Sequence, residues 1–152
     1  MTVKKRNEIR LNNVLFPYWM LVLFPATWLV ILPGNFIIDS LVLLASMAIL
    51  GTENKKQCYK KHILPIFALG MISDIIGGVY MFLMLAVFEV ANMGDELFLT
   101  IPAIIISAVV IFVFNYFFTF RSSEKAFRLK MSLIFAIVTA PYTFLMPNSW
   151  MY

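Results

Sequence analysis

Charged residues are scarce in this sequence, and cysteine and histidine are almost missing. Only 13% of the 152 residues are charged, whereas a soluble domain carries about 25%. The single cysteine, Cys58, excludes a disulfide framework, and one cysteine with one histidine cannot form a cysteine-ligated zinc site. The chain also lacks the GxSxG, HExxH and glycine-rich phosphate-loop motifs. We therefore expect no enzyme, no metal and no cofactor.

Apolar residues, in contrast, make up 62% of the chain, and the mean hydropathy is +0.89. This is more apolar surface than one small water-soluble core can hide, so we expect the lipid bilayer to cover much of it. Alternating ten-residue strands are missing, and open strand edges are not tolerated in lipid. The sequence predicts an all-α, multi-pass integral protein of the cell (plasma or inner) membrane.

Five apolar segments are candidates for membrane-spanning helices, which need roughly 20 residues each. They are residues 14–32, 36–50, 63–88, 97–120 and 131–148. We expect a tight turn at Pro33-Gly34-Asn35 between the first two segments. The third is longer than a span requires and is expected to tilt or to bend at Gly77-Gly78. The predicted fold is a single domain, a bundle of five transmembrane helices.

All basic residues fall on one side of this predicted membrane. Of the 12, four lie in residues 1–13, four in the connection before residue 63 and four in the connection after residue 120. Because short basic loops stay in the cytoplasm, the N-terminus is predicted to be cytoplasmic and the C-terminus extracytoplasmic. Any homo-oligomer should then be parallel, and a membrane partner subunit is the alternative. Loops this short offer no nucleic-acid-binding surface.

Two acidic residues, Asp74 and Asp39, lie within predicted spans. Asp74 lies near the middle of its span, where a charge costs at least about 2.5 to 3.5 kcal/mol. Such a residue normally faces the bundle interior and stays protonated, pairs with a donor, or binds a cation. Asp39 is expected about one turn inside the outer edge, at a depth that differs from that of Asp74 by roughly 10 to 15 Å. This separation argues against a shared-proton pair of the aspartyl-protease kind.

Small and polar residues recur at helical spacing on four of the spans and predict faces that pack together. Close packing alone explains most such residues in membrane bundles. Ser107 and Thr139 are predicted at the depth of Asp74 and are its expected neutral partners. The candidate residues for binding an ion or a substrate are Asp74, Asp39, Ser73, Ser107, Asn115 and Thr139.

Basic residues at the inner face are candidates for binding anionic lipid headgroups. They are Lys60, Lys61, Arg121 and Arg128. The topology already explains why these residues are basic, so a headgroup site and a simple topology signal both remain open.

The end of the fourth span, Phe114-Asn115-Tyr116-Phe117-Phe118-Thr119-Phe120-Arg121, resembles the aromatic-rich end of a helix in GtrA-like proteins. The similarity covers eight of the 152 residues, and the five predicted spans differ from the four helices of that family. GtrA-like proteins are small membrane proteins linked to the movement of polyprenyl-phosphate-linked sugars. The resemblance implies handling of a lipid-linked substrate, with Asn115 and Arg121 near its phosphate.

Three functions remain open at this stage. The leading hypothesis is a transporter or a solute- or ion-binding membrane subunit in which Asp74 is a proton or cation site. The second is handling of a lipid or a polyprenyl-phosphate-linked substrate, as a GtrA-like flippase. The third is a non-transporting assembly or regulatory partner of a larger membrane complex.

Overall fold

The computed structural model describes residues 28–88 and 96–145, with the side chains of 85–88, 96, 97, 99 and 143 left out. In these ranges the chain is entirely helical, which confirms the all-α prediction. The α-helices are α1 (Trp28–Ile49), α2 (Lys55–Phe88), α3 (Glu96–Phe114) and α4 (Lys125–Val138). A π-helix, η4 (Asn115–Thr119), continues α3, and a 3-10 helix, η5 (Tyr142–Leu145), follows α4.

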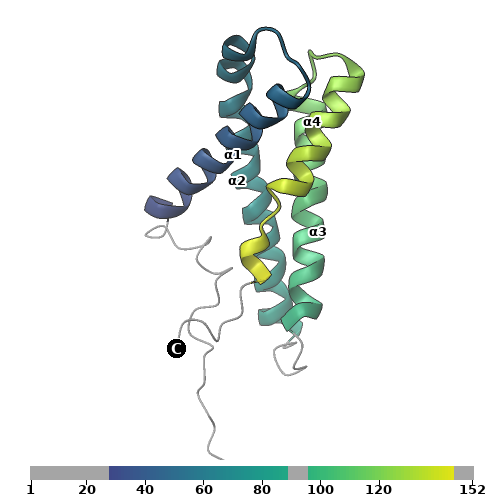
Figure 1. Ribbon diagram of the computed structural model, residues 1–152. Coiled ribbons are helices and arrows are strands. Elements are labelled where there is room, and N and C mark those ends of the chain that lie inside the picture. Colours follow the sequence, from purple (N-terminus) through teal and green to yellow (C-terminus); the bar gives the residue numbers. More distant parts are fainter. Residues whose placement is uncertain (1–27, 89–95, 146–152) are drawn as a thin grey trace, which may run out of the picture.

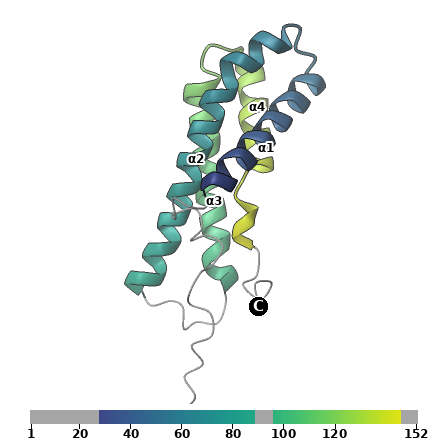
Figure 2. The same ribbon diagram turned by 90° about the vertical axis from the view of Figure 1, so that its left-hand side faces the viewer.

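Helices α2 and α3 lie side by side along the length of the bundle (Figures 1 and 2). Helix α1 packs on α2 and is inclined to it, while α4 packs on α3 and also contacts α1. The connection from α1 to α2 and the connection from α3 to α4 lie at the same end of the bundle. Lys61 Nζ on α2 donates a 2.8 Å hydrogen bond to Ser122 Oγ in the connection from α3 to α4. We call this end, which carries Arg121 and the basic residues near the starts of α2 and α4, the basic end.

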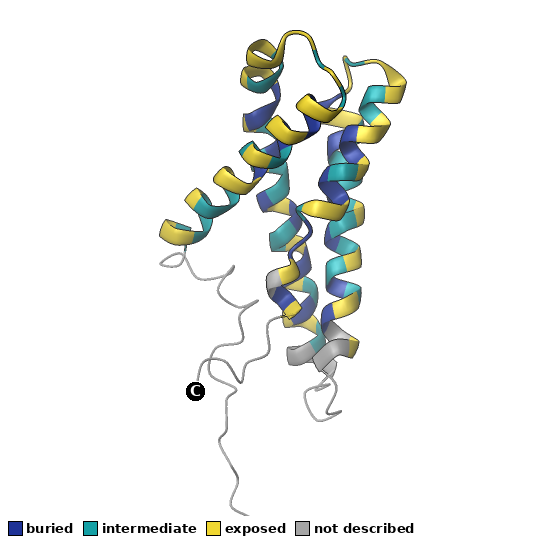
Figure 3. Ribbon diagram, in the orientation of Figure 1, coloured by how far each residue is buried: buried dark blue, intermediate teal, exposed yellow. Residues whose placement is uncertain are grey.

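Three of the helices are long and apolar enough to cross a membrane. The stretches are Trp28–Ile49, Lys55–Met84 and Thr100–Thr119. Exposed and buried residues are distributed as expected for a bundle in lipid (Figure 3). Leu29 is 82% exposed, whereas Ser73 and Ser107 are fully buried. Large apolar side chains therefore cover the outside, and small polar side chains lie where helices meet.

The expected turn at Pro33-Gly34-Asn35 is wrong, because α1 runs without interruption through these residues. The predicted span 36–50 is thus the second part of a 22-residue helix. In an apolar environment every backbone amide needs an internal partner, so a helix tolerates proline and glycine that would end it in water. Most of the predicted span 14–32 lies outside the described residues.

The predicted fifth span, 131–148, is also corrected. Helix α4 begins earlier and has only 14 residues, because it ends at Val138. Pro141 disfavours a helical conformation of the residue before it, so the chain turns at Thr139-Ala140 and η5 begins at Tyr142. The predicted span 63–88 ends with α2, which begins eight residues earlier at Lys55, and the predicted span 97–120 agrees closely with α3 plus η4. The count of five spans is not confirmed.

A glycine cap ends α1 and reverses the chain direction before α2 begins. Gly51 has a φ of +66°, a conformation that glycine adopts without steric cost. Thr52 N–H donates to Met47 O at 3.0 Å, and Gly51 N–H donates to Ala48 O at 3.4 Å. This pair of bonds is a Schellman motif, which satisfies carbonyl groups at the helix end. The resulting reversal places α1 antiparallel to α2.

Candidate functional site

The contact between α1 and α2 brings together the two acids that lie within these helices. On α1, Asn35 and Asp39 are four residues apart and therefore lie on one face. Asn35 Nδ2 donates a 3.2 Å hydrogen bond to Asp74 Oδ2 and contacts Met71 Sδ at 3.3 Å. One turn further along α1, Asp39 Oδ2 would lie 3.7 Å from a Cβ atom on Gly70. We call Asp39 and Asp74 the carboxyl pair.

Glycine at position 70 lets the Asp39 carboxyl approach the backbone of α2 closely. Gly70 and Asp74 are one helical turn apart, so the antiparallel register places the two carboxyl groups roughly one turn, or about 5 Å, from each other along the contact. They are close enough to interact electrostatically. The expected depth difference of 10 to 15 Å is therefore wrong. Its cause is the continuous α1, in which Asp39 lies in the middle of the helix and not near an edge.

Asp39 is buried, Asp74 is half-buried, and the pair is incompletely hydrogen-bonded. Asp39 is 6% exposed. Asp74 Oδ1 is buried and has no hydrogen-bond partner among the described residues. Two ionised carboxylates this close in a low-dielectric interior repel each other, and a bound proton or cation relieves the repulsion. The arrangement can thus hold a proton or a small cation.

The partner of Asp74 is Asn35, and the prediction that Ser107 and Thr139 would fill this role is wrong. Ser107 Oγ donates instead to Ser73 O at 3.1 Å, and Thr139 Oγ1 donates to Phe135 O at 2.8 Å. Ser73 Oγ donates to Leu69 O at 2.8 Å. These three hydroxyl groups satisfy backbone carbonyls, as is common in membrane helices.

Sequence reasoning missed Asn35 as a site residue. Its spacing of four from Asp39 is the signal of a shared helical face. The expected turn at Pro33-Gly34-Asn35 hides this signal, because it places Asn35 outside a helix.

Asn115 opens η4 and lies away from these contacts. Its Nδ2 donates to Ile111 O at 3.0 Å, and the residue is 1% exposed. It belongs to the interior nearer the basic end, beside Phe120, whose N–H donates to Asn115 O at 2.9 Å.

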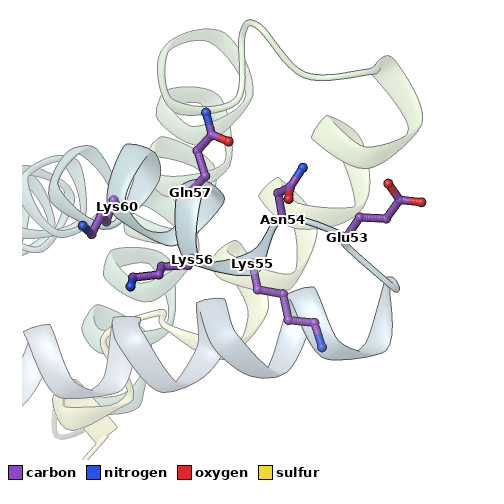
Figure 4. A pocket seen from close by; sticks show the side chains of 6 residues that line it. All are labelled: Glu53, Asn54, Lys55, Lys56, Gln57 and Lys60. Carbon is purple, nitrogen blue, oxygen red and sulfur yellow. The ribbon is translucent and has the colours of Figure 1, made fainter.

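The four basic candidates occupy different environments at the basic end. Lys60 lines an open depression with Glu53, Asn54, Lys55, Lys56 and Gln57 (Figure 4). Lys61 is bonded to Ser122, and Arg121 is exposed. The Arg128 guanidinium carbon lies 4.1 Å from the centre of the Tyr116 ring, and Nη2 donates to Tyr116 Oη at 3.0 Å. Arg128 is therefore held by an aromatic side chain, and Lys60 faces an open surface.

The structure supplies few residues that can hold a metal. Within residues 28–88 and 96–145, no three histidine, cysteine, aspartate or glutamate side chains group closely enough to bind a metal ion.

No protein-family model matches the chain, and comparison with curated proteins and with solved structures found no match.

Proposed function

We propose that this protein binds and exchanges a proton or a small cation at the carboxyl pair, as a transporter or as an ion-binding subunit of a membrane complex. The observation that carries the proposal is the environment of Asp74. One carboxyl oxygen accepts a hydrogen bond from Asn35, and the other is buried without a partner beside the carboxyl group of Asp39.

The charge balance at this position supports the proposal. Asn35 is neutral, so its hydrogen bond orients Asp74 without compensating a negative charge. Neither acid interacts with a lysine or an arginine in the described part of the chain. Unpaired acids inside membrane proteins usually lie on ion or proton pathways, because an uncompensated charge there is expensive. A purely structural role needs only one neutral hydrogen bond and does not need a second acid.

Flux measurements on reconstituted vesicles test the proposal. The purified protein is placed in vesicles that contain a dye sensitive to protons, to sodium or to potassium, and a gradient of the matching ion is imposed. We expect flux with the unaltered protein, and a fall to the level of empty vesicles with Asp74→Asn or Asp39→Asn. Glu53→Gln, which changes an exposed acid at the basic end, is the matched control.

Two outcomes would contradict this function. Unchanged flux in both Asp→Asn variants would exclude the carboxyl pair as the ion site. If the unaltered, folded protein shows no flux for any of the three ions, an assembly or regulatory role becomes the better explanation, and co-purification of a membrane partner should then be sought. Thermal unfolding of each variant in detergent separates loss of flux from loss of fold.

We also propose that the open depression at the basic end binds anionic lipid headgroups or a lipid-linked phosphate. The supporting observation is the open depression, to which Lys55, Lys56 and Lys60 contribute three positive charges (Figure 4). Each basic residue near an anionic surface contributes about 1 kcal/mol of attraction. Native mass spectrometry should show retained phosphatidylglycerol, and less of it when the three lysines are replaced by glutamine. Lys125→Gln with Lys130→Gln, two exposed changes on α4, is the control.

A further inference from the structure

Four buried polar side chains lie in the interior near the basic end, away from the carboxyl pair. They are His62 on α2, Asn115 and Thr119 on η4, and Ser132 on α4, with exposed fractions of 4%, 1%, 7% and 0%. We call them the inner polar cluster.

The sequence neighbours of all four residues belong to one hydrophobic core. That core includes Ile63, Ile66, Ile111, Phe120, Met131 and Phe135, each of which is adjacent in sequence to a cluster residue or one helical turn from it. The Phe120 ring lies 5.0 Å from the His62 ring and 6.4 Å from the Phe135 ring. His62 and Asn115 thus both contact Phe120, and Phe135, which packs against the same ring, lies one helical turn from Ser132.

Each member of the cluster has one polar atom without a hydrogen-bond partner among the described residues. The atoms are His62 Nε2, Asn115 Oδ1, Thr119 Oγ1 and Ser132 Oγ. Buried polar atoms are almost always hydrogen-bonded, to protein or to ordered water, because an unmet bond is expensive in the interior. Each of these four atoms therefore needs a partner that the described side chains do not supply.

The hydrogen bonds that the cluster makes show which kind of partner each remaining atom needs. His62 Nδ1 lies 2.8 Å from Cys58 O, which can only accept, so Nδ1 carries the hydrogen and the neutral ring presents a lone pair at Nε2. Asn115 uses its amide nitrogen toward Ile111 O, which leaves Oδ1 as a free acceptor. The two hydroxyl groups can donate or accept. The missing partners must therefore include a hydrogen-bond donor for His62 Nε2 and one for Asn115 Oδ1, and either a donor or an acceptor for each hydroxyl group.

We propose that the inner polar cluster binds internal water molecules. Water can supply both donors and acceptors, and buried waters in proteins typically bond to two to four polar groups. A cation is disfavoured because the cluster has no carboxylate and lies near the lysines and arginines of the basic end. The π-helix supports a binding role, since π-turns inside membrane or soluble helices are often found at functional sites.

This hydration site is independent of the proposed function. Eight residues separate His62 from Gly70, a distance of about 12 Å along α2. Leu43 and Ile66, which are 0% and 1% exposed, lie in the core between the two regions. Water at the cluster is therefore separated from the carboxyl pair by an apolar layer.

Solid-state NMR of the full chain in lipid bilayers tests the proposal directly. Magnetisation transferred from water should reach the His62 ring nitrogens and the Asn115 side-chain amide several times faster than it reaches the Leu43 methyl groups. Transfer to His62 and Asn115 as slow as transfer to Leu43 would overturn the proposal. The measurement uses the unaltered protein and does not depend on any variant folding.

A matched pair of substitutions gives a second readout. A hydroxyl bound to water stabilises the fold, whereas a hydroxyl that is buried and unbonded destabilises it. Ser132→Ala should therefore lower the Tm measured in detergent by more than Ser46→Ala, whose lost hydroxyl is bonded only to Val42 O in its own helix. A Tm for Ser132→Ala equal to or above that of the unaltered protein would contradict bound water at this position.

Discussion

The side-chain amide of Asn35 on α1 donates a hydrogen bond of 3.2 Å to Oδ2 of Asp74 on α2. The same amide lies 3.3 Å from Met71 Sδ, one turn before Asp74. Through these contacts α1 forms one side of the candidate site. They also fix the register of α1 on α2, in which the Asp39 carboxyl lies next to Gly70. A neutral donor thus orients an acid that has no cationic partner.

The Asn35–Asp74 hydrogen bond should contribute measurably to stability. We expect Asn35→Leu to lower the free energy of unfolding, because Asp74 loses its donor and stays buried. In a double-mutant cycle with Asp74→Leu, the coupling energy should be about 0.6 to 1.7 kcal/mol, as found for hydrogen bonds between membrane helices. Denaturant unfolding in detergent measures it. Gln57→Leu, an exposed change on α2, serves as the control, and a coupling of zero would contradict the bond.

Close packing of α2 on α3 should make Gly77 intolerant of any side chain. A Cβ atom at this position would overlap Ser107 Oγ and lie 3.0 Å from Phe144 and 3.4 Å from Ala103 O. Gly77→Ala should therefore destabilise the protein by about 1 to 3 kcal/mol, as overpacked cores do. A Cβ atom at Gly34 would have no neighbour within 4 Å, so Gly34→Ala should not destabilise the protein.

Removing the obstructing hydroxyl should partly rescue the Gly77 variant. Ser107→Ala deletes the Oγ atom that a new Cβ would strike. The double variant should therefore be more stable than the sum of the two single effects implies, as measured by thermal unfolding. Strict additivity would show that the Ser107 contact does not limit position 77.

Arg128 should not be replaceable by lysine. Its guanidinium group lies over the Tyr116 ring and also donates to Tyr116 Oη. Lysine lacks the planar group that stacks on aromatic rings, so Arg128→Lys should cost about 0.5 to 2 kcal/mol of stability. Arg121→Lys, at an exposed position, is the matched control. Equal unfolding midpoints for the two variants would show that the Tyr116 contact is energetically neutral.

The basic end should face the cytoplasm, because short basic loops are retained there. Single cysteines at Asn54, in the α1–α2 connection, and at Glu96, the first residue of α3, test this in a Cys58→Ser background. A membrane-impermeant maleimide should label Glu96→Cys in intact cells and Asn54→Cys only after permeabilisation. The reverse pattern would invert the orientation, and the Cys58→Ser protein alone should stay unlabelled.

Helices α2 and α3 were predictable because their signal is local. Each contains a long apolar run without charged residues except Asp74, and the flanking charges mark where the run ends. Their agreement with the predicted spans reflects the simple requirement for about 20 apolar residues.

Two prolines show where local reasoning fails. Both prolines lie in apolar segments of the sequence. Pro33 is inside α1, whereas Pro141 follows the end of α4. Proline disfavours a helical residue before it in each case. Whether the helix continues depends on whether neighbouring groups satisfy the freed carbonyls, which is a property of the surrounding bundle.

The order of apolar residues in the sequence determined that this chain is helical and has helices suited to a membrane, because burial in lipid depends on how many apolar residues lie in a row. The grouping of basic residues at one end also followed from their sequence positions. Only the tertiary structure decided that Asn35 contacts Asp74 and that Asp39 lies beside Gly70. Those pairs join residues more than 30 positions apart, and their register depends on how closely small residues let two helices approach.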